Sequence, residues 1–98
     1  MADLDSLQFE RDPDKAARNL RAHGVSFDEA ESVFGGPLAR AYPDAAHSIA
    51  ESRYLLVGRS EVGRLLMVVY SPHDLLIRII SARTPTRRER HDYEQASS

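Results

Sequence analysis

The sequence predicts a single α+β domain with two helices near its N-terminus, an antiparallel sheet after them and a short C-terminal helix. Helix-start patterns occur early, at residues 12–13 and 26–29, and again at residues 86–89. Apolar runs occupy residues 54–59, 64–70 and 75–80, with turn-forming residues between them. Helices that precede a run of hairpin-connected strands are typical of the α+β class.

Size and composition predict one domain spanning residues 1–98, with residues 1–7 frayed. Of the 98 residues, 42% are hydrophobic and 29% are charged, close to the averages of soluble globular domains. No stretch approaches the roughly 18 consecutive apolar residues of a membrane span, and the acidic start is unlike a signal peptide. Cysteine is absent, which excludes disulfides and thiolate metal sites. We expect a cytoplasmic protein without a membrane partner.

Two helices are predicted early in the chain. The first begins after the N-cap residue Asp12 and ends near Gly24, which can adopt the left-handed conformation that closes a helix. The second begins at Ser26, which forms a capping box with Glu29, and it stops at residues 35–37. Its apolar face consists of Phe27, Ala30, Val33 and Phe34. The first helix has a thinner apolar face, made of Ala16, Ala17 and Leu20.

Strands are predicted at residues 7–11, 38–42, 54–59, 64–70 and 75–80, and a loop at residues 43–52. Four-residue turns at 60–63 and 71–74 set the register: Arg59 faces Arg64, Leu66 faces Ile79, and Met67 faces Arg78. The face that the helices should cover holds Leu55, Val57, Leu66, Val68, Ile77 and Ile79. The other face holds Tyr54, Leu56, Leu65, Met67, Val69, Arg78 and Ile80. A slip of one residue would exchange these faces.

Charge is divided unevenly along the chain. Residues 1–52 carry five Lys or Arg against ten Asp or Glu, a balance of −5, whereas residues 53–91 carry eight Arg against three acids, a balance of +5. Asp92 and Glu94 complete the net charge of −2. Lysine is nearly absent, and the planar fork of arginine suits phosphate or carboxylate recognition. We expect an anion-binding surface, with a merely solvated arginine surface as the alternative.

Arg78 interrupts the apolar run of residues 75–80 and is the most informative single residue. A guanidinium inside a core strand costs free energy unless it is paired or opens onto a cleft. Arg78 therefore either pairs or reaches solvent, or it binds phosphate on a concave sheet face. Arg83, where the strand ends, has the same two interpretations. Other arginines mark strand ends, where solvated residues are also expected: Arg53, Arg59 and Arg64.

Residues that can move protons are few. Glu89 could serve as a general base, yet its capping box with Thr86, from which the last helix should run to about Gln95, explains it without catalysis. Tyr93 lies four residues further on the same helix face. His23 lies at a helix C-terminus, where a structural role is the simpler interpretation. No spacing matches a metal site, a phosphate loop or a nucleophile elbow.

An enzyme limited to arginine, glutamate, histidine and tyrosine is chemically suited to cleave RNA. The 2′-hydroxyl of RNA is an internal nucleophile. The protein then needs only to position the chain, stabilise the pentavalent phosphate and assist proton transfer.

Three segments share the order and spacing of a known family: residues 9–15, residues 19–27, and residues 79–83 followed by Arg87-Arg88-Glu89-Arg90 and Tyr93. With these segments, residues 8–94 resemble the BrnT toxin family. The resemblance implies a RelE-like fold and the ribonuclease toxin of a type II toxin–antitoxin module. It also implies a BrnA antitoxin partner, which binds DNA through a ribbon-helix-helix domain, so that the toxin meets DNA only through its partner.

The resemblance carries function to matching positions only. It implies that Arg78 and Arg83 bind and stabilise the scissile phosphate, and that Arg53 or Arg64 positions the backbone. The full set is Arg64, Arg78, Arg83 and Glu89 for catalysis, with Lys15, His23, Arg53, Arg88 and Tyr93 for substrate binding. Glu89, His23 or Tyr93 would move protons, and no metal or cofactor is implied. Ala22 and residues 71–74 depart from the family by lacking its usual basic residues, which weakens the expected RNA binding.

We therefore predict a metal-independent endoribonuclease toxin that inhibits translation and is neutralised by a BrnA-like antitoxin. The alternative is a degenerate toxin that serves as an antitoxin-binding module in operon repression. A purely structural domain is the third interpretation.

Overall fold

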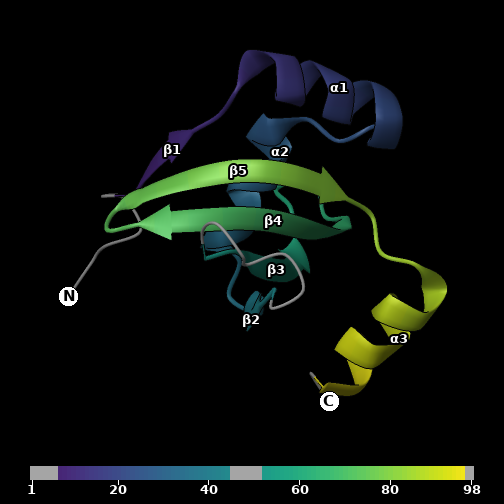
Figure 1. The fold of residues 1–98 in the computed structure, drawn as a ribbon. Coiled ribbons are helices and arrows are strands. Elements are labelled where there is room, and N and C mark those ends of the chain that lie inside the picture. Colours follow the sequence, from purple (N-terminus) through teal and green to yellow (C-terminus); the bar gives the residue numbers. More distant parts are fainter. Residues whose placement is uncertain (1–6, 45–51, 97–98) are drawn as a thin grey trace.

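A computed structural model describes residues 7–44 and 52–96, which form a five-stranded sheet and three α-helices (Figure 1). The elements follow the predicted order: β1 (Gln8–Glu10), α1 (Pro13–His23), α2 (Phe27–Ser32), the 3₁₀ turn η2 (Val33–Gly35), β2 (Arg40–Pro43), β3 (Tyr54–Arg59), β4 (Leu65–His73), β5 (Leu76–Arg83) and α3 (Arg87–Ala96). The predicted α+β class is confirmed. Residues 1–6 and 45–51 lie outside the described residues, and with them most of the predicted frayed start and loop.

The sheet is mixed, which corrects the prediction of an antiparallel sheet. Its strand order is β1-β5-β4-β3-β2, and β1 runs parallel to β5 while every other pair is antiparallel. The prediction considered strands joined by short turns, which must be antiparallel. No short turn joins β1 to β5, because both helices and three strands lie between them in the chain. The direction of β1 is therefore decided by packing at the sheet edge.

The helix starts and ends follow from local hydrogen bonds, as predicted. The Asp12 carboxylate accepts from the Asp14 N–H at 2.8 Å, and Gly24, at φ +68°, donates its N–H to the Leu20 carbonyl at 2.9 Å. Ser26 Oγ accepts from the Glu29 N–H at 3.1 Å, but the returning half of this capping box is absent. The Glu29 carboxylate instead accepts from Ser60 and Arg64, in the turn between β3 and β4.

The register differs from the prediction because both turns are shorter. Arg59 faces Leu65 instead of Arg64. β4 continues through the predicted second turn, so that Asp74-Leu75 alone connect it to β5, with Asp74 at φ +57°. As a result Ile79 faces Tyr70 instead of Leu66, and Arg78 faces Ser71 instead of Met67.

The shorter first turn also exchanges the faces of β3. Leu56 packs in the core beneath α2, whereas Leu55 and Val57 lie on the opposite face of the sheet. The predicted placement of these residues and of Tyr54 was therefore wrong. The β4 and β5 residues predicted for the helix-covered face do lie there: Leu66, Val68, Ile77 and Ile79. Ile80 is the exception in β5, since the pairing shifts between Val69 and Tyr70 and Ile80 lines a depression with α1 residues.

Asn19 fixes α1 to the sheet. Its side chain is buried, donates from Nδ2 to the Val25 and Ala82 carbonyls at 2.9 and 2.8 Å, and accepts the Ala82 N–H at 3.0 Å. The predicted apolar face of α1 is only partly used, because Leu20 is 51% exposed. The Asn19 amide thus bonds the Ala82 backbone as a neighbouring strand would. These hydrogen bonds, more than apolar contacts, attach α1 to the sheet.

The third helix lies away from the first two. Figure 1 shows α1 and α2 together, with α3 beyond the end of β5. Tyr93 of α3 packs against a small cluster on the opposite side of the sheet, formed by Val57, Leu65 and Met67. None of the helices in the described part of the chain is long and apolar enough to cross a membrane.

Candidate functional site

The sheet face opposite α1 and α2, here called the α3 face, carries arginines along its margins. Residues that face each other on neighbouring strands point to the same side of a sheet. One such row across the α3 face consists of Arg40, Val57, Met67 and Arg83. The next row consists of Tyr42, Leu55, Val69 and Ser81. A third contains Ser71, Arg78 and Glu10.

Arg53 belongs to the same face. It precedes β3 directly, and its carbonyl accepts the Asp44 N–H at 2.9 Å, which continues the pairing of β2 with β3. The alternation of side chains then places Arg53 with Leu55. The structure thus gathers three predicted site residues, Arg53, Arg78 and Arg83, on one face.

Arg40 was missed as a site residue by the sequence reasoning. Its alternation with Tyr42 in a short strand was visible, but the face it occupies depends on the pairing of β2 with β3. Arg40 is exposed, and its side chain makes no hydrogen bond or ion pair with other described residues. An arginine without an acidic partner is available to an external anion.

Arg83 is held by Glu89 in a two-pronged ion pair. Its Nη1 and Nη2 donate to Oε1 and Oε2 of Glu89 at 2.8 and 2.9 Å. Thr86 also donates its N–H to Glu89 at 2.8 Å and accepts the Glu89 N–H at 3.2 Å, so the predicted capping box is complete. The Arg83 hydrogen bonds, with help from Thr86, lower the pKa of Glu89 to about 2. Glu89 is therefore ionised at neutral pH and is a weak proton acceptor in this state.

Arg78 forms an exposed ion pair with Glu10. Its Nε lies 3.4 Å from Oε1 of Glu10, its neighbour across the β1–β5 pair, and the two side chains are 43% and 48% exposed. Exposed ion pairs of this kind contribute little free energy. A phosphate could therefore replace the carboxylate at small cost.

Lys15 and His23 lie on α1 and not on the α3 face. Both line a depression of about 270 Å³ over Ile80, together with Arg18. Lys15 also borders a second depression, of about 330 Å³, that Arg78 lines. Lys15 is thus near Arg78 at the sheet margin. The described contacts do not bring His23 to Arg83 or Glu89.

Arg64 is placed apart from the other predicted catalytic residues. Its Nε and Nη2 donate to the Glu29 carboxylate at 2.7 and 2.6 Å, and Nη2 also donates to the Gly24 carbonyl at 2.8 Å. Ser60 donates to the same carboxylate at 2.7 Å. The arrangement ties the end of α1, the start of α2 and the β3–β4 turn together. A structural role accounts for every polar contact of this guanidinium.

This network predicts a pH-dependent contribution to stability. The Arg64 hydrogen bonds lower the pKa of Glu29, despite an opposing effect of burial. A lowered pKa means that the contribution is present above the unfolded value of about 4.3 and is lost as pH falls through the folded value. Glu29→Gln should therefore cost about 1.5–3 kcal/mol at pH 7. Urea unfolding at pH 7 and pH 3 should show that difference shrinking in acid.

Glu31 on the same helix provides the control. Burial raises its pKa, so that the folded chain favours the neutral form. Glu31→Gln should leave stability at pH 7 unchanged or slightly higher. Equal losses for both variants would contradict a specific role of the Glu29–Arg64 pair.

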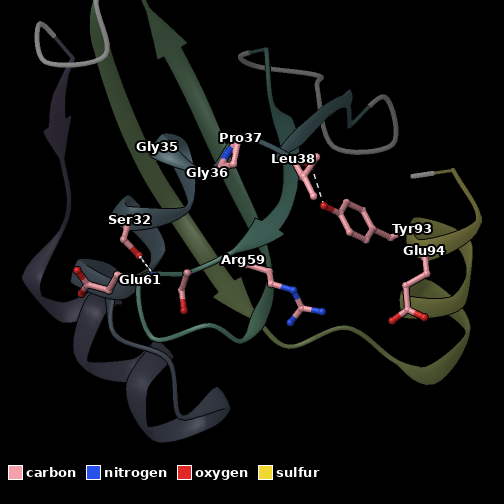
Figure 2. A pocket seen from close by; sticks show the side chains of 10 residues that line it. Ser32, Gly35, Gly36, Pro37, Leu38, Arg59, Glu61, Tyr93 and Glu94 are labelled. Atoms are coloured by element: carbon pink, nitrogen blue, oxygen red, sulfur yellow. Dashed lines mark hydrogen bonds between the residues drawn. The ribbon is translucent and has the colours of Figure 1, made fainter. Parts of the chain in front are cut away.

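Tyr93 separates two hollows beside α3. Its hydroxyl donates to the Leu38 carbonyl at 2.7 Å, which joins α3 to the segment before β2 (Figure 2). The larger hollow, of about 540 Å³, lies between residues 35–38 and the β3–β4 turn, and Arg59, Glu61 and Glu94 line it. The smaller, of about 260 Å³, lies on the α3 face and is shared by Tyr93 and Glu89, as their helix spacing predicted. Arg88 is exposed on the first turn of α3.

Potential metal ligands are not clustered in the described part of the chain. Within residues 7–44 and 52–96 no three histidine, aspartate or glutamate side chains are grouped closely enough to hold a metal ion. The histidine of the predicted 43–52 loop, His47, lies outside the described residues. The α3 face carries arginines along its margins, two of which, Arg78 and Arg83, are paired with the carboxylates of Glu10 and Glu89.

Comparisons with known proteins identify the family and the fold. Residues 12–89 match the family model described as the ribonuclease toxin BrnT of type II toxin–antitoxin systems. The crystal structure of the Brucella abortus ribonuclease toxin BrnT resembles the fold with a TM-score of 0.64 and 20% sequence identity, covering 83% of this chain and 99% of that one. At that identity the likeness concerns the fold. No curated protein matches the sequence.

Proposed function

Because the chain belongs to the BrnT family of ribonuclease toxins from type II toxin–antitoxin systems, we propose that it is an endoribonuclease that cleaves RNA on the α3 face. The observation that supports this site is the gathering of Arg53, Arg78 and Arg83 on one sheet face that α1 and α2 leave open. Arginine forks suit the oxygens of a phosphodiester. RNA would lie across this sheet face, as the implied RelE-like fold suggests.

The reaction is an internal phosphoryl transfer. The 2′-oxygen of RNA forms a bond to the adjacent phosphorus while the bond to the 5′-oxygen of the next nucleotide breaks. The products are a 2′,3′-cyclic phosphate and a 5′-hydroxyl end, and the proton of the 2′-hydroxyl is balanced by the one that the leaving oxygen takes up. In the proposed reaction, arginines stabilise the negative charge on the pentavalent phosphate. The reaction therefore does not need a metal ion for this purpose.

Arg83 and Arg78 are the proposed phosphate ligands, with Arg53, Lys15 and Arg88 positioning the rest of the RNA chain. Glu89 holds the Arg83 fork in place before RNA arrives and gives it up to the phosphate. Its low pKa makes this holding role a better fit than that of a general base.

The proposal includes a partner. A BrnA-like ribbon-helix-helix antitoxin would silence the enzyme by covering the α3 face, and only the antitoxin would contact DNA. Without it, RNA loss in the cytoplasm would inhibit translation. The second candidate function, a degenerate toxin that only binds its antitoxin, is favoured by the fact that Arg78 and Arg83 are both already paired with acids.

Expression of the chain without a partner tests the proposal. The unaltered protein should arrest growth with loss of RNA, and Arg78→Ala should relieve the arrest while remaining folded. Arg21→Ala is the matched control, because Arg21 is exposed on α1 and should leave the arrest unchanged. Normal growth with well-expressed, folded wild-type protein would contradict the enzyme. Tight binding to a co-encoded ribbon-helix-helix protein in that case would support the binding module.

A further inference from the structure

The smaller hollow on the α3 face has the size and walls of a site for one planar ring. Its floor consists of Val57 and Met67, which are 5% and 6% exposed, together with Leu55. Tyr42 and Tyr93 stand at its sides, and Tyr42 is 41% exposed and able to offer a ring face. Its volume of about 260 Å³ is below the roughly 300–1,000 Å³ of pockets for drug-sized ligands.

The rim of this hollow carries a carboxylate without a partner. Asp92 is exposed, and its carboxylate makes no hydrogen bond or ion pair with other described residues. The other rim carboxylate, Glu89, already accepts from Arg83 and Thr86. Asp92 is therefore the acceptor available to a ligand, and an ionised carboxylate can only accept.

Phosphate ligands flank the hollow. Arg40 and Arg83 end the row whose two middle residues, Val57 and Met67, form the floor. Three inter-strand steps separate the two arginine backbones, which is about 14 Å. A nucleotide with its base in the hollow would then have an arginine on either side of it.

We propose that this hollow is a nucleobase subsite that prefers guanine, and this rests on the proposed ribonuclease function. The base stacks on Tyr42, its Watson–Crick edge faces Asp92, and the flanking phosphates meet Arg40 and Arg83. Guanine presents N1–H and its amino group side by side, two donors for one carboxylate. The other bases place an acceptor next to a donor on that edge, which a carboxylate disfavours. Single-stranded RNA is commonly read by such stacking and edge contacts.

The Asp92 carboxylate favours a ligand with hydrogen-bond donors over an apolar protein side chain in this hollow. An apolar side chain of a partner would fill the floor but would cover Asp92 without giving it a donor, which is unfavourable. The larger hollow also sets two carboxylates, Glu61 and Glu94, beside an arginine, but the row of residues from Arg40 to Arg83 crosses the floor of the smaller hollow.

Binding of short RNA that cannot be cleaved tests the subsite directly. The probes are fluorescently labelled RNAs of five nucleotides with 2′-O-methyl groups. The four outer bases are uracil, and the central base is guanine, adenine, cytosine or uracil. Binding to the full chain is measured by fluorescence anisotropy. We expect the guanine probe to bind about tenfold more tightly than the others, as for a good paired contact to a base edge. Asp92→Asn should bring the ratio close to one.

The variants of Tyr42 separate stacking from folding. Tyr42→Leu should weaken all probes by about tenfold, whereas Tyr42→Phe should retain wild-type binding. Glu61→Gln, which removes one exposed negative charge elsewhere, should preserve the guanine preference. Because Tyr42 and Asp92 are exposed, thermal melts should show these variants folded.

The outcomes distinguish this subsite from the ribonuclease function. Cleavage of unmodified RNA, combined with equal binding of all four probes, would overturn the subsite but support the ribonuclease function. Guanine-selective binding of the probes, together with no cleavage of unmodified RNA, would support the subsite and contradict the enzyme. Unchanged RNA binding in Tyr42→Leu and Asp92→Asn, with weakened antitoxin binding, would assign the hollow to a protein partner and overturn the subsite.

Discussion

Replacing Arg83 by alanine is expected to lower the rate of RNA cleavage by about 10²–10³-fold, the range found when a main stabiliser of transition-state charge is removed. Arg83 presents its fork in a fixed orientation, set by two hydrogen bonds to Glu89. The same fork can donate to two phosphate oxygens when RNA displaces the acid. Initial rates on a short fluorogenic RNA at pH 7 provide the measurement, with Arg21→Ala as the control that should cleave at the wild-type rate.

A second variant shows whether Arg83 acts on RNA or only anchors α3. Glu89→Gln breaks the same ion pair but keeps Arg83 and an oxygen for the Thr86 N–H. We expect cleavage by Glu89→Gln to change by less than about tenfold, since removing a general base typically costs about 10²–10⁴-fold. Equal, large losses in both variants would contradict the phosphate-binding role of Arg83.

Asn19→Ala is expected to reduce the free energy of unfolding by about 3 kcal/mol. The truncation leaves the Ala82 N–H and the carbonyls of Ala82 and Val25 without their amide partner in a buried place. Each unsatisfied buried group costs about 1–3 kcal/mol, partly recovered by water or local movement. Urea unfolding followed by circular dichroism measures the change, and the melting temperature should fall by roughly 10 °C or more.

Leu20→Ala is the control for this substitution. Leu20 follows Asn19 in α1 but is 51% exposed, so its truncation should change stability by less than about 0.5 kcal/mol. A urea midpoint for Asn19→Ala equal to that of Leu20→Ala would show that α1 is held by other contacts.

Features that depend on a few neighbouring residues were predicted well. The caps at Asp12 and Ser26, the left-handed Gly24 and the complete capping box of Thr86 and Glu89 all involve groups within four residues of each other. The order of helices and strands follows from the same local patterns. Such features need no knowledge of the remaining fold.

Register was predicted less well, because shortening a turn by one residue exchanges the two faces of the strand. The β3–β4 turn closes with the Ser60 N–H donating to the Arg64 carbonyl at 2.9 Å, so that Arg59 pairs with Leu65. That single change carried Leu55 and Val57 to the α3 face, where they line the proposed base subsite. The residue pattern did not distinguish a three-residue turn from a four-residue turn, and that difference exchanges the two faces of a strand.

The sequence by itself determined the α+β class, the helix boundaries and the supply of arginines in the second half of the chain. Only the tertiary structure decided which of them share a face. Arg64 finds Glu29, 35 residues away, and is drawn into a structural network, whereas Arg40 joins Arg83 through the pairing of four strands. The reason is physical: each guanidinium pairs with the carboxylate that folding brings near it, or stays exposed on the surface. The residues that decide this are distant in the chain.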